Sequence, residues 1–143
     1  MTTVRQLLAE KGHDVIAVVP DSTVYEAIRL MAEKNIGALA VVADSGLVGI
    51  FSERNYARNV FLKGKASPTT SVAEVMSERP VCVSPDETVE ECMALMTDKL
   101  VRHLPVLEDN QMIGIVSIGD LVKSIIREQK FIIDQLGHYI QGG

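Results

Sequence analysis

The sequence predicts a mixed α/β fold of the α+β type, in which one β-α-β-β-α unit occurs twice. Three observations lead to this prediction. The chain has 143 residues, a usual length for one compact domain. Hydrophobic residues make up 47% of it, enough to form a sizeable core. The stretch from Pro20 to Arg58 also aligns without a gap on the stretch from Pro85 to Lys123.

The internal repeat is the strongest of these observations, because a long self-match indicates one supersecondary unit used more than once. Two such copies are expected to pack sheet to sheet about a pseudo-twofold axis, with their helices outside. Each copy would then bury surface that the other cannot bury alone. The matching stretches are 19–24 with 84–89, 30–31 with 95–96, 39–42 with 104–107 and 48–52 with 113–117, and a looser match joins 4–8 to 72–76.

The first copy opens with a strand and a helix. A β-branched run at 16–19 predicts a short strand that ends at Pro20. Thr23 is a good N-cap residue, and the apolar residues after it recur at helical spacing. Asn35 and Gly37 are expected to end this helix, because both tolerate the backbone conformation found at helix C-termini.

Two strands and a second helix complete the first copy. The continuous apolar run at 38–43 is typical of a strand buried on both faces. A turn at 44–46 and a strand at 47–51 follow, and Ser52 opens the second helix. The stretch 63–70 is rich in Gly, Ser, Thr and Pro and is expected to be the linker.

The second copy repeats this order and is followed by a segment with no counterpart in the first. We place repeat 1 at residues 1–66, repeat 2 at 67–128 and a C-terminal amphipathic helical tail at 129–143. Within repeat 2 we expect strands at 81–83, 104–107 and 112–116, a helix at 88–98 and another from Ser117. In the tail, Ile132, Ile133, Leu136 and Ile140 fall on one helical face, which either packs on its own domain or forms a dimer contact.

Composition excludes several classes of function. The net charge of −5 argues against nucleic acid as the main partner, because neutralising phosphates requires a basic surplus. No apolar run approaches the length that spans a bilayer, and no secretory signal is visible, so we expect a cytoplasmic protein with no membrane contact. Cys82, Cys92 and the three histidines are not spaced as metal ligands, so no metal and no catalytic cofactor are expected.

The candidate site lies where the second strand of each copy runs into its second helix. Ser52 and Asn55 stand there in copy one, and Ser117 and Asp120 in copy two. Backbone N–H groups and the helix dipole at such a start favour an anion, and a carboxylate one turn inside the helix can accept hydrogen bonds from a vicinal diol such as a ribose. The alternative is a capping box that only stabilises the helix.

These motifs resemble the cystathionine-β-synthase (CBS) repeat. The resemblance rests on the Pro-Asp-x-Thr-Val start of the repeat, on the Leu-Pro-Val strand at 104–106 and on the Gly-x-x-Ser-x-x-Asp stretch that ends at Asp120, and it extends from about Val4 to Arg127. It implies a flat pair of repeats, often doubled into a homodimer. It also implies clefts between the paired repeats that bind AMP, ATP, NAD or S-adenosylmethionine.

The resemblance assigns roles to four residues of copy two. Asp120 would hold the ribose hydroxyls, and Ser117 would lie near the ribose or the phosphate. Arg102 and His103, directly before the Leu-Pro-Val strand, would reach the phosphates. The alternative for Arg102 and His103 is a solvated edge of the strand.

Copy one departs from the family pattern. Asn55 stands where the family usually has Asp, so the pairing with a diol should be weaker. Gly37 and Ala38, at the positions of Arg102 and His103, would let an adenine approach the backbone, or they simply end a helix and begin a core strand. Basic residues follow Ser52 and would suit phosphate or diphosphate, or they form a solvated surface: Arg54, Arg58, Lys63 and Lys65.

The sequence therefore predicts a non-catalytic regulatory module that binds an adenosine nucleotide and signals its occupancy to an unidentified effector protein. The alternatives are an adenylate- or NAD-processing enzyme and a structural interaction protein without a ligand. No spacing places a nucleophile or a general base beside His103, which disfavours the enzyme. Helix faces expected to be apolar and exposed indicate a homodimer; they lie near Tyr56, Val60, Leu121 and Ile125.

Overall fold

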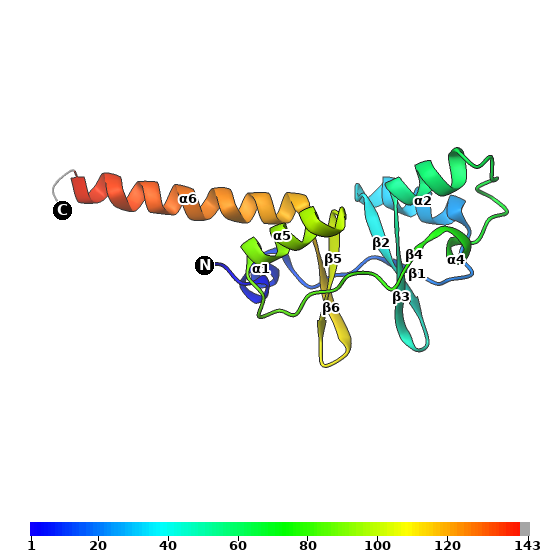
Figure 1. Ribbon diagram of the computed structural model, residues 1–143, viewed down its shortest axis with the longest axis horizontal. Coiled ribbons are helices and arrows are strands. Elements are labelled where there is room, and N and C mark those ends of the chain that lie inside the picture. Colours follow the sequence, from blue (N-terminus) through cyan, green and yellow to red (C-terminus); the bar gives the residue numbers. More distant parts are fainter. Residues whose placement is uncertain (141–143) are drawn as a thin grey trace. The chain divides into compact units, whose positions relative to one another are not determined.

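The computed structural model describes residues 1–140, apart from the side chains of Tyr139 and Ile140. The chain forms two compact units, and Figure 1 shows the elements of each. Unit 1 comprises Met1–His13, Cys82–Glu108 and the chain from Gly114 onward, and unit 2 comprises Asp14–Val81 and Asp109–Ile113. The two β-α-β-β-α units predicted from the repeat are confirmed.

Unit 2 is built on a four-stranded sheet with the order β1-β2-β3-β4. Strand β1 pairs in parallel with β2, and the two other pairings are antiparallel. The strands are β1 (Ala17–Val18), β2 (Ala38–Ala43), β3 (Gly46–Ser52) and β4 (Ser77–Glu78). The helices are α2 (Val24–Lys34), α3 (Glu53–Asn55), the π-helix η1 (Tyr56–Phe61) and α4 (Val72–Val75).

The caps predicted for α2 are confirmed. The Thr23 hydroxyl oxygen accepts a hydrogen bond from the backbone N–H of Glu26 at 3.1 Å, and a Glu26 carboxylate oxygen accepts from the backbone N–H of Thr23 at 3.4 Å. These bonds satisfy donors that a helix start otherwise leaves unpaired. Asn35 ends the helix in the left-handed conformation, with φ at 55°. The local sequence signals are therefore sufficient to define both ends.

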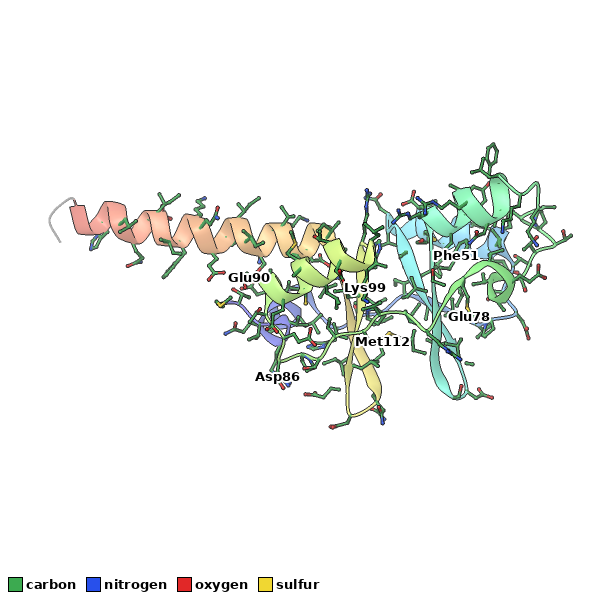
Figure 2. The ribbon with its side chains drawn as sticks, in the orientation of Figure 1. Phe51, Glu78, Asp86, Glu90, Lys99 and Met112 are labelled. Atoms are coloured by element: carbon green, nitrogen blue, oxygen red, sulfur yellow. The ribbon has the colours of Figure 1, made fainter. Side chains whose placement is uncertain are left out.

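The core of unit 2 lies where α2 and α4 cover the sheet. Phe51 of β3 is fully buried there, and Figure 2 shows it among the side chains of this unit. The four residues that open β2 (38–41) are buried, as expected of a strand covered on both faces. Around Phe51 the buried apolar cluster consists of Val24, Ala27, Met31, Leu39, Val41, Val60, Val72 and Val75.

Unit 1 repeats this arrangement in a shorter form. Its two-stranded sheet has the order β5-β6, and Val83 forms a parallel bridge with Val106. This bridge reproduces the pairing of Val18 with Val41 in copy one, shifted by the register of the repeat. The elements are α1 (Val4–Lys11), α5 (Val89–Lys99), β5 (His103–Glu108), β6 (Gln111–Ser117), whose first three residues are grouped with unit 2, and α6 (Ile118–Ile140).

The short helix that precedes each copy packs in the compact unit of the other copy. The backbone N–H of Val4 in α1 donates to the carbonyl of Glu87 at 2.8 Å, and the N–H of Val72 in α4 donates to the carbonyl of Ser22 at 2.8 Å. These are equivalent bonds, because the two donors and the two acceptors occupy matching repeat positions. Alignment of the repeat reveals the similar helices but does not say that they are exchanged.

The exchanged helices explain the glycine that both copies keep in their second long strand. A Cβ added to Gly49 would lie 2.5 Å from the sulfur of Met76 and 2.8 Å from the carbonyl oxygen of Ser77. A Cβ added to Gly114 would lie 2.7 Å from a terminal carbon of Leu8. In each copy the missing side chain therefore makes room for the exchanged helix or the residue after it.

We expect Gly49→Ala to destabilise the protein by about 1–3 kcal/mol, as overpacking does. Gly114→Ala should cost less, because the end of the Leu8 side chain can rotate away, whereas the Ser77 carbonyl belongs to the paired strand β4. Urea denaturation of the two variants measures the difference. Equal losses, or a larger loss for Gly114→Ala, would contradict this account of the close approach.

Helix α6 continues from the second copy into the predicted tail without a break, over 23 residues, and Figure 1 shows it extending beyond α5. The tail is thus helical as far as the description reaches, while the side chain of Ile140 and residues 141–143 lie outside it. Ile132, Ile133 and Leu136 are exposed to 50%, 65% and 56%. They do not pack on their own unit. Of the helices in the described chain, none combines the length and hydrophobicity that a membrane span needs.

The prediction of exposed apolar helix faces was partly wrong. Val60 and Leu121 are 1% and 0% exposed and belong to the cores of their units. Tyr56 and Ile125 are half-buried. Helical spacing alone does not distinguish the inward stripe from an outward one when a helix carries both. The exposed stripe of α6 begins one residue later than expected, with Val122 and Ile126.

Candidate functional site

Both strand-to-helix junctions form reciprocal hydrogen bonds. In copy two, the Asp120 backbone N–H donates to the Ser117 hydroxyl at 3.1 Å, and the Ser117 N–H donates to Asp120 Oδ2 at 2.8 Å. In copy one, the Asn55 N–H donates to the Ser52 hydroxyl at 3.2 Å, and the Ser52 N–H donates to Asn55 Oδ1 at 2.9 Å. The capping alternative is therefore confirmed in both copies, and any ligand role comes in addition to it.

The two caps leave different capacities for a ligand. Asn55 Oδ1 also accepts from the Ser52 hydroxyl at 2.9 Å, and Asn55 Nδ2 donates to the Ser77 hydroxyl at 3.0 Å. The amide of Asn55 therefore has one N–H left to offer. Asp120 uses only Oδ2 for its bonds to described residues, so Oδ1 stays open. The copy-two junction has more acceptor capacity for a diol.

Lys11 is a member of this site that the sequence analysis missed. It ends the exchanged helix α1, and its Nζ lies 2.6 Å from Asp120 Oδ2 and 2.5 Å from the carbonyl oxygen of Ile115. The alignment of the two copies gives a weak indication that Lys11 belongs to the site. Extending the match of 4–8 with 72–76 by three residues sets Lys11 against Arg79, so a basic residue stands seven positions after the valine that opens the short helix in both copies.

Lys11 and Ser117 lower the pKa of the Asp120 carboxyl group. Its burial acts to raise its pKa, but the hydrogen bonds from Lys11 Nζ and from the Ser117 backbone N–H outweigh that effect, and the pKa lies below its usual range. The carboxylate is therefore ionised at neutral pH. It can act as an acceptor for hydroxyl groups and is not a proton donor.

His103 lies close enough to this carboxylate to feel its charge, and the charge of Arg102 also acts on His103. Burial lowers the pKa of His103, the charges of Lys11 and Arg102 lower it further, and the Asp120 carboxylate partly opposes them. The carbonyl of Arg102 accepts the backbone N–H of Ile118 at 2.9 Å, which ties the start of β5 to the start of α6. The four residues predicted for copy two thus lie together in unit 1, and Lys11 joins them.

We expect the protein to lose stability as the pH falls below the ordinary histidine value of 6.5. The unfolded chain takes up a proton at His103 more readily than the folded chain, so protonation favours unfolding. Melting temperatures between pH 7.5 and 5.5 measure this loss. The carboxylate of Asp120 titrates below this window, so His103→Gln should flatten the profile. An unchanged profile in His103→Gln would contradict the assignment.

The basic residues predicted for copy one are on the surface of unit 2. Arg54 and Arg58 are exposed, and Lys65 Nζ lies 3.7 Å from a carboxylate oxygen of Glu74. A helix does begin after Ser52, as predicted, and in it α3 gives way to the π-helix η1 after three residues. Copy two has no such change at the start of α6. The helical segments that follow the two junctions therefore differ.

Gly37 and Ala38 lie at different depths. Gly37 lines an open groove of about 480 Å³ in unit 2, together with Met31, Ile36 and Tyr56. Its walls are partly apolar, with Asn35 and Glu53 also lining it, and a groove of this size suits a flat ligand such as a purine. Ala38 is buried at the start of β2, where it pairs with Ser52. Its role as a ligand contact stays a prediction, whereas Gly37 is open to solvent at the groove.

Groups suited to covalent or metal chemistry do not gather in the described part of the chain. No three His, Cys, Asp or Glu residues there are close enough to hold a metal ion. Burial and the charges of Glu87 and Glu91 raise the pKa of Cys92 to about 11, so its thiol is protonated and a weak nucleophile. The chemistry that the Asp120 site offers is charge and hydrogen bonding.

Comparison with known proteins agrees with this architecture. The family model of the CBS domain matches residues 4–61 and 72–127. The chain is 38% identical over 151 residues to the CBS domain-containing protein CBSX3, mitochondrial, of Arabidopsis thaliana, and the match covers 99% of this chain and 73% of that protein. A solved CBS-domain structure named NE2398 is 50% identical, with a TM-score of 0.84, over 87% of this chain and 98% of that chain.

A more distant structure has the same fold. It is the CBS domain pair of protein MJ0100 in complex with 5′-methylthioadenosine and S-adenosyl-L-methionine, with a TM-score of 0.77 at 24% identity over 87% of this chain and 99% of that chain. The family match, unlike this distant likeness, rests on sequence and covers both copies of the repeat. The chain therefore belongs to the CBS-domain family and carries two CBS domains.

Proposed function

We propose that the protein is a non-catalytic sensor that binds an adenosine nucleotide and signals its occupancy to a separate effector protein. The observation that carries the proposal is the cluster around Asp120 in unit 1. An ionised carboxylate with one open oxygen is paired there with Lys11 and lies near His103, whose pKa the charge of Arg102 also affects. A carboxylate suits ribose hydroxyls and the basic groups suit a phosphate, so the cluster fits the ribose and the phosphate of a nucleoside monophosphate.

The adenosine class is supported by two further observations. The distant relative MJ0100 carries two adenosine derivatives in its solved complex. The chain also belongs to a family whose modules are typically regulatory and bind adenosine ligands. Among AMP, ATP, NAD and S-adenosylmethionine, we propose AMP for this site, because its ribose diol and single phosphate match the carboxylate and the ammonium group there.

The two copies should not bind alike. The amide of Asn55 is nearly saturated by its cap and by Ser77, so copy one offers little to a ribose. Its surface instead carries Arg54, Arg58 and Lys65, which favour ligands with more phosphate charge. The groove at Gly37 would take the base. We therefore propose an AMP-preferring site at Asp120 and a second site, at Asn55, whose affinity depends on phosphate.

Two observations together test the sensor against its alternatives. Mass spectrometry of ligands released from the purified protein should find an adenosine nucleotide, and added AMP should raise the melting temperature, because a ligand that binds only the folded state stabilises it. Turnover of ATP or NAD would favour an enzyme. If no nucleotide co-purifies and none raises the melting temperature, the protein is an interaction module and the sensor proposal fails.

We further propose that the protein is a homodimer, with α6 as the contact. Its exposed stripe comprises Val122, Ile126, Ile132, Ile133 and Leu136, each 40–65% exposed. Exposed apolar side chains along one helix are a common interaction surface, and a second copy would offer the same stripe. Light scattering should give twice the monomer mass, and Ile133→Asp should give the monomer mass. A monomeric wild-type protein would refute the proposal.

The cellular compartment stays a prediction. The composition predicts a cytoplasmic protein, whereas the name of the Arabidopsis relative includes mitochondrial. Fractionation of the native cells decides between these locations. Neither location changes the chemistry of the Asp120 cluster.

A further inference from the structure

Lys11 has an unusual position among the groups around Asp120. It belongs to α1, which lies outside the strand-to-helix junction, and it reaches this junction only because the short helices are exchanged. Its Nζ is bound to Asp120 Oδ2 and to the Ile115 carbonyl. An ammonium group has three donors, so one N–H remains for a ligand. The Lys11 side chain keeps 36% of its surface exposed.

Lys11 also sets the charge of the site. Without it, the negative charge of Asp120 and the positive charge of Arg102 would cancel beside a His103 whose pKa lies below its ordinary value. A phosphate would then meet a site without surplus positive charge, close to a carboxylate that no ammonium group pairs. With Lys11 present, the carboxylate is paired and the site keeps a positive charge in excess.

We propose that Lys11 makes the Asp120 site select phosphorylated adenosine ligands over the unphosphorylated nucleoside. This inference rests on the proposed nucleotide site. Lys11 leaves Asp120 Oδ1 open for a ribose hydroxyl, so it need not weaken the sugar contact. Its charge and its remaining N–H act on the phosphate, which adenosine lacks. Removing the Lys11 side chain should therefore weaken the binding of AMP and leave the binding of adenosine nearly unchanged.

His103 provides a local readout that separates this site from the one in copy one. Its imidazole lies close enough to Lys11 and Asp120 for their charges to affect its pKa. Ligand-induced shifts of the His103 imidazole signals in NMR spectra therefore report occupancy at Asp120. Titrations with adenosine and with AMP give two affinities, and their ratio is the selectivity of this site.

The test compares Lys11→Met and Lys11→Gln with the wild-type protein, with Lys11→Arg and with Lys130→Met. In the neutral variants the ratio of AMP affinity to adenosine affinity should fall by about tenfold. This is the usual effect of losing a hydrogen bond to a charged group. Lys11→Arg should keep most of the ratio. Lys130→Met removes an exposed charge farther along α6 and should keep all of it. Lys11→Gln retains a donor for Ile115, so the test survives if Lys11→Met does not fold.

Equal weakening of both ligands would show that Lys11 only ties α1 to the junction, and would overturn the inference. Tighter AMP binding in the neutral variants would also overturn it, because Lys11 would then compete with the ligand for Asp120. If wild-type protein shows no His103 shift with adenosine or AMP while both are soluble and the protein is folded, the nucleotide site itself is absent. That outcome differs from the two before it, because it refutes the proposed function as well as the inference about Lys11.

Discussion

Asp120→Ala should abolish the preference of the protein for AMP over 2′-deoxy-AMP. In the wild-type protein the Asp120 carboxylate is ionised and has one oxygen open, so it should favour the ligand with both ribose hydroxyls by about tenfold. AMP and 2′-deoxy-AMP carry the same phosphate group. Their affinity ratio is therefore insensitive to the change in charge that frees Lys11 from its ion pair. Calorimetric titration of both ligands measures the ratio.

Asn55→Ala is the matched control for this substitution. It removes the equivalent side chain of copy one, whose amide is nearly saturated by Ser52 and Ser77. The AMP preference should remain close to that of the wild-type protein. If Asp120→Ala keeps the preference, or if Asn55→Ala is the variant that removes it, the assignment of the ribose site to copy two is wrong.

Phe51→Ala should cost about 3–5 kcal/mol of unfolding free energy, which is the usual loss for a buried aromatic residue. Phe51 is fully buried in unit 2, where the exchanged helix α4 and helix α2 contribute to the same cluster. A loss of this size is a large share of the stability of a typical domain. Urea denaturation followed by circular dichroism measures it.

Phe61→Ala is the matched control, because the two phenylalanines belong to the same copy but Phe61 is 70% exposed. This variant should change the stability by less than about 0.5 kcal/mol, as surface substitutions usually do. Similar losses in the two variants would mean that the core of unit 2 does not lie where the structure places it.

Much of each unit could be predicted because local signals agree with the repeat. Thr23 and Thr88 both form capping boxes with a glutamate three residues later, and both signals are readable in the sequence. The bridge of Val83 with Val106 occurs where the first copy pairs Val18 with Val41. Since propensity, pattern and repeat register indicate the same elements, the predicted order was confirmed.

The remaining features depend on contacts that no local pattern encodes. Lys11 reaches Asp120 because α1 packs with the second copy, and that exchange follows from tertiary packing. The burial of Leu121 and the exposure of Val122 depend on which side of α6 faces its own unit. The Ser that recurs at both junctions, followed three residues later by Asn55 or Asp120, predicted a site, but only the structure shows that caps use part of it.

The most direct test of the central claim is a calorimetric titration of the purified protein, first freed of bound nucleotide, with AMP and then with ATP. We expect AMP to bind one site more tightly than the other, and Asp120→Ala to weaken that binding by about tenfold while a salt-sensitive ATP binding remains. The salt dependence follows from the exposed basic residues of copy one. No heat with either nucleotide, or two identical and independent sites, would contradict the account.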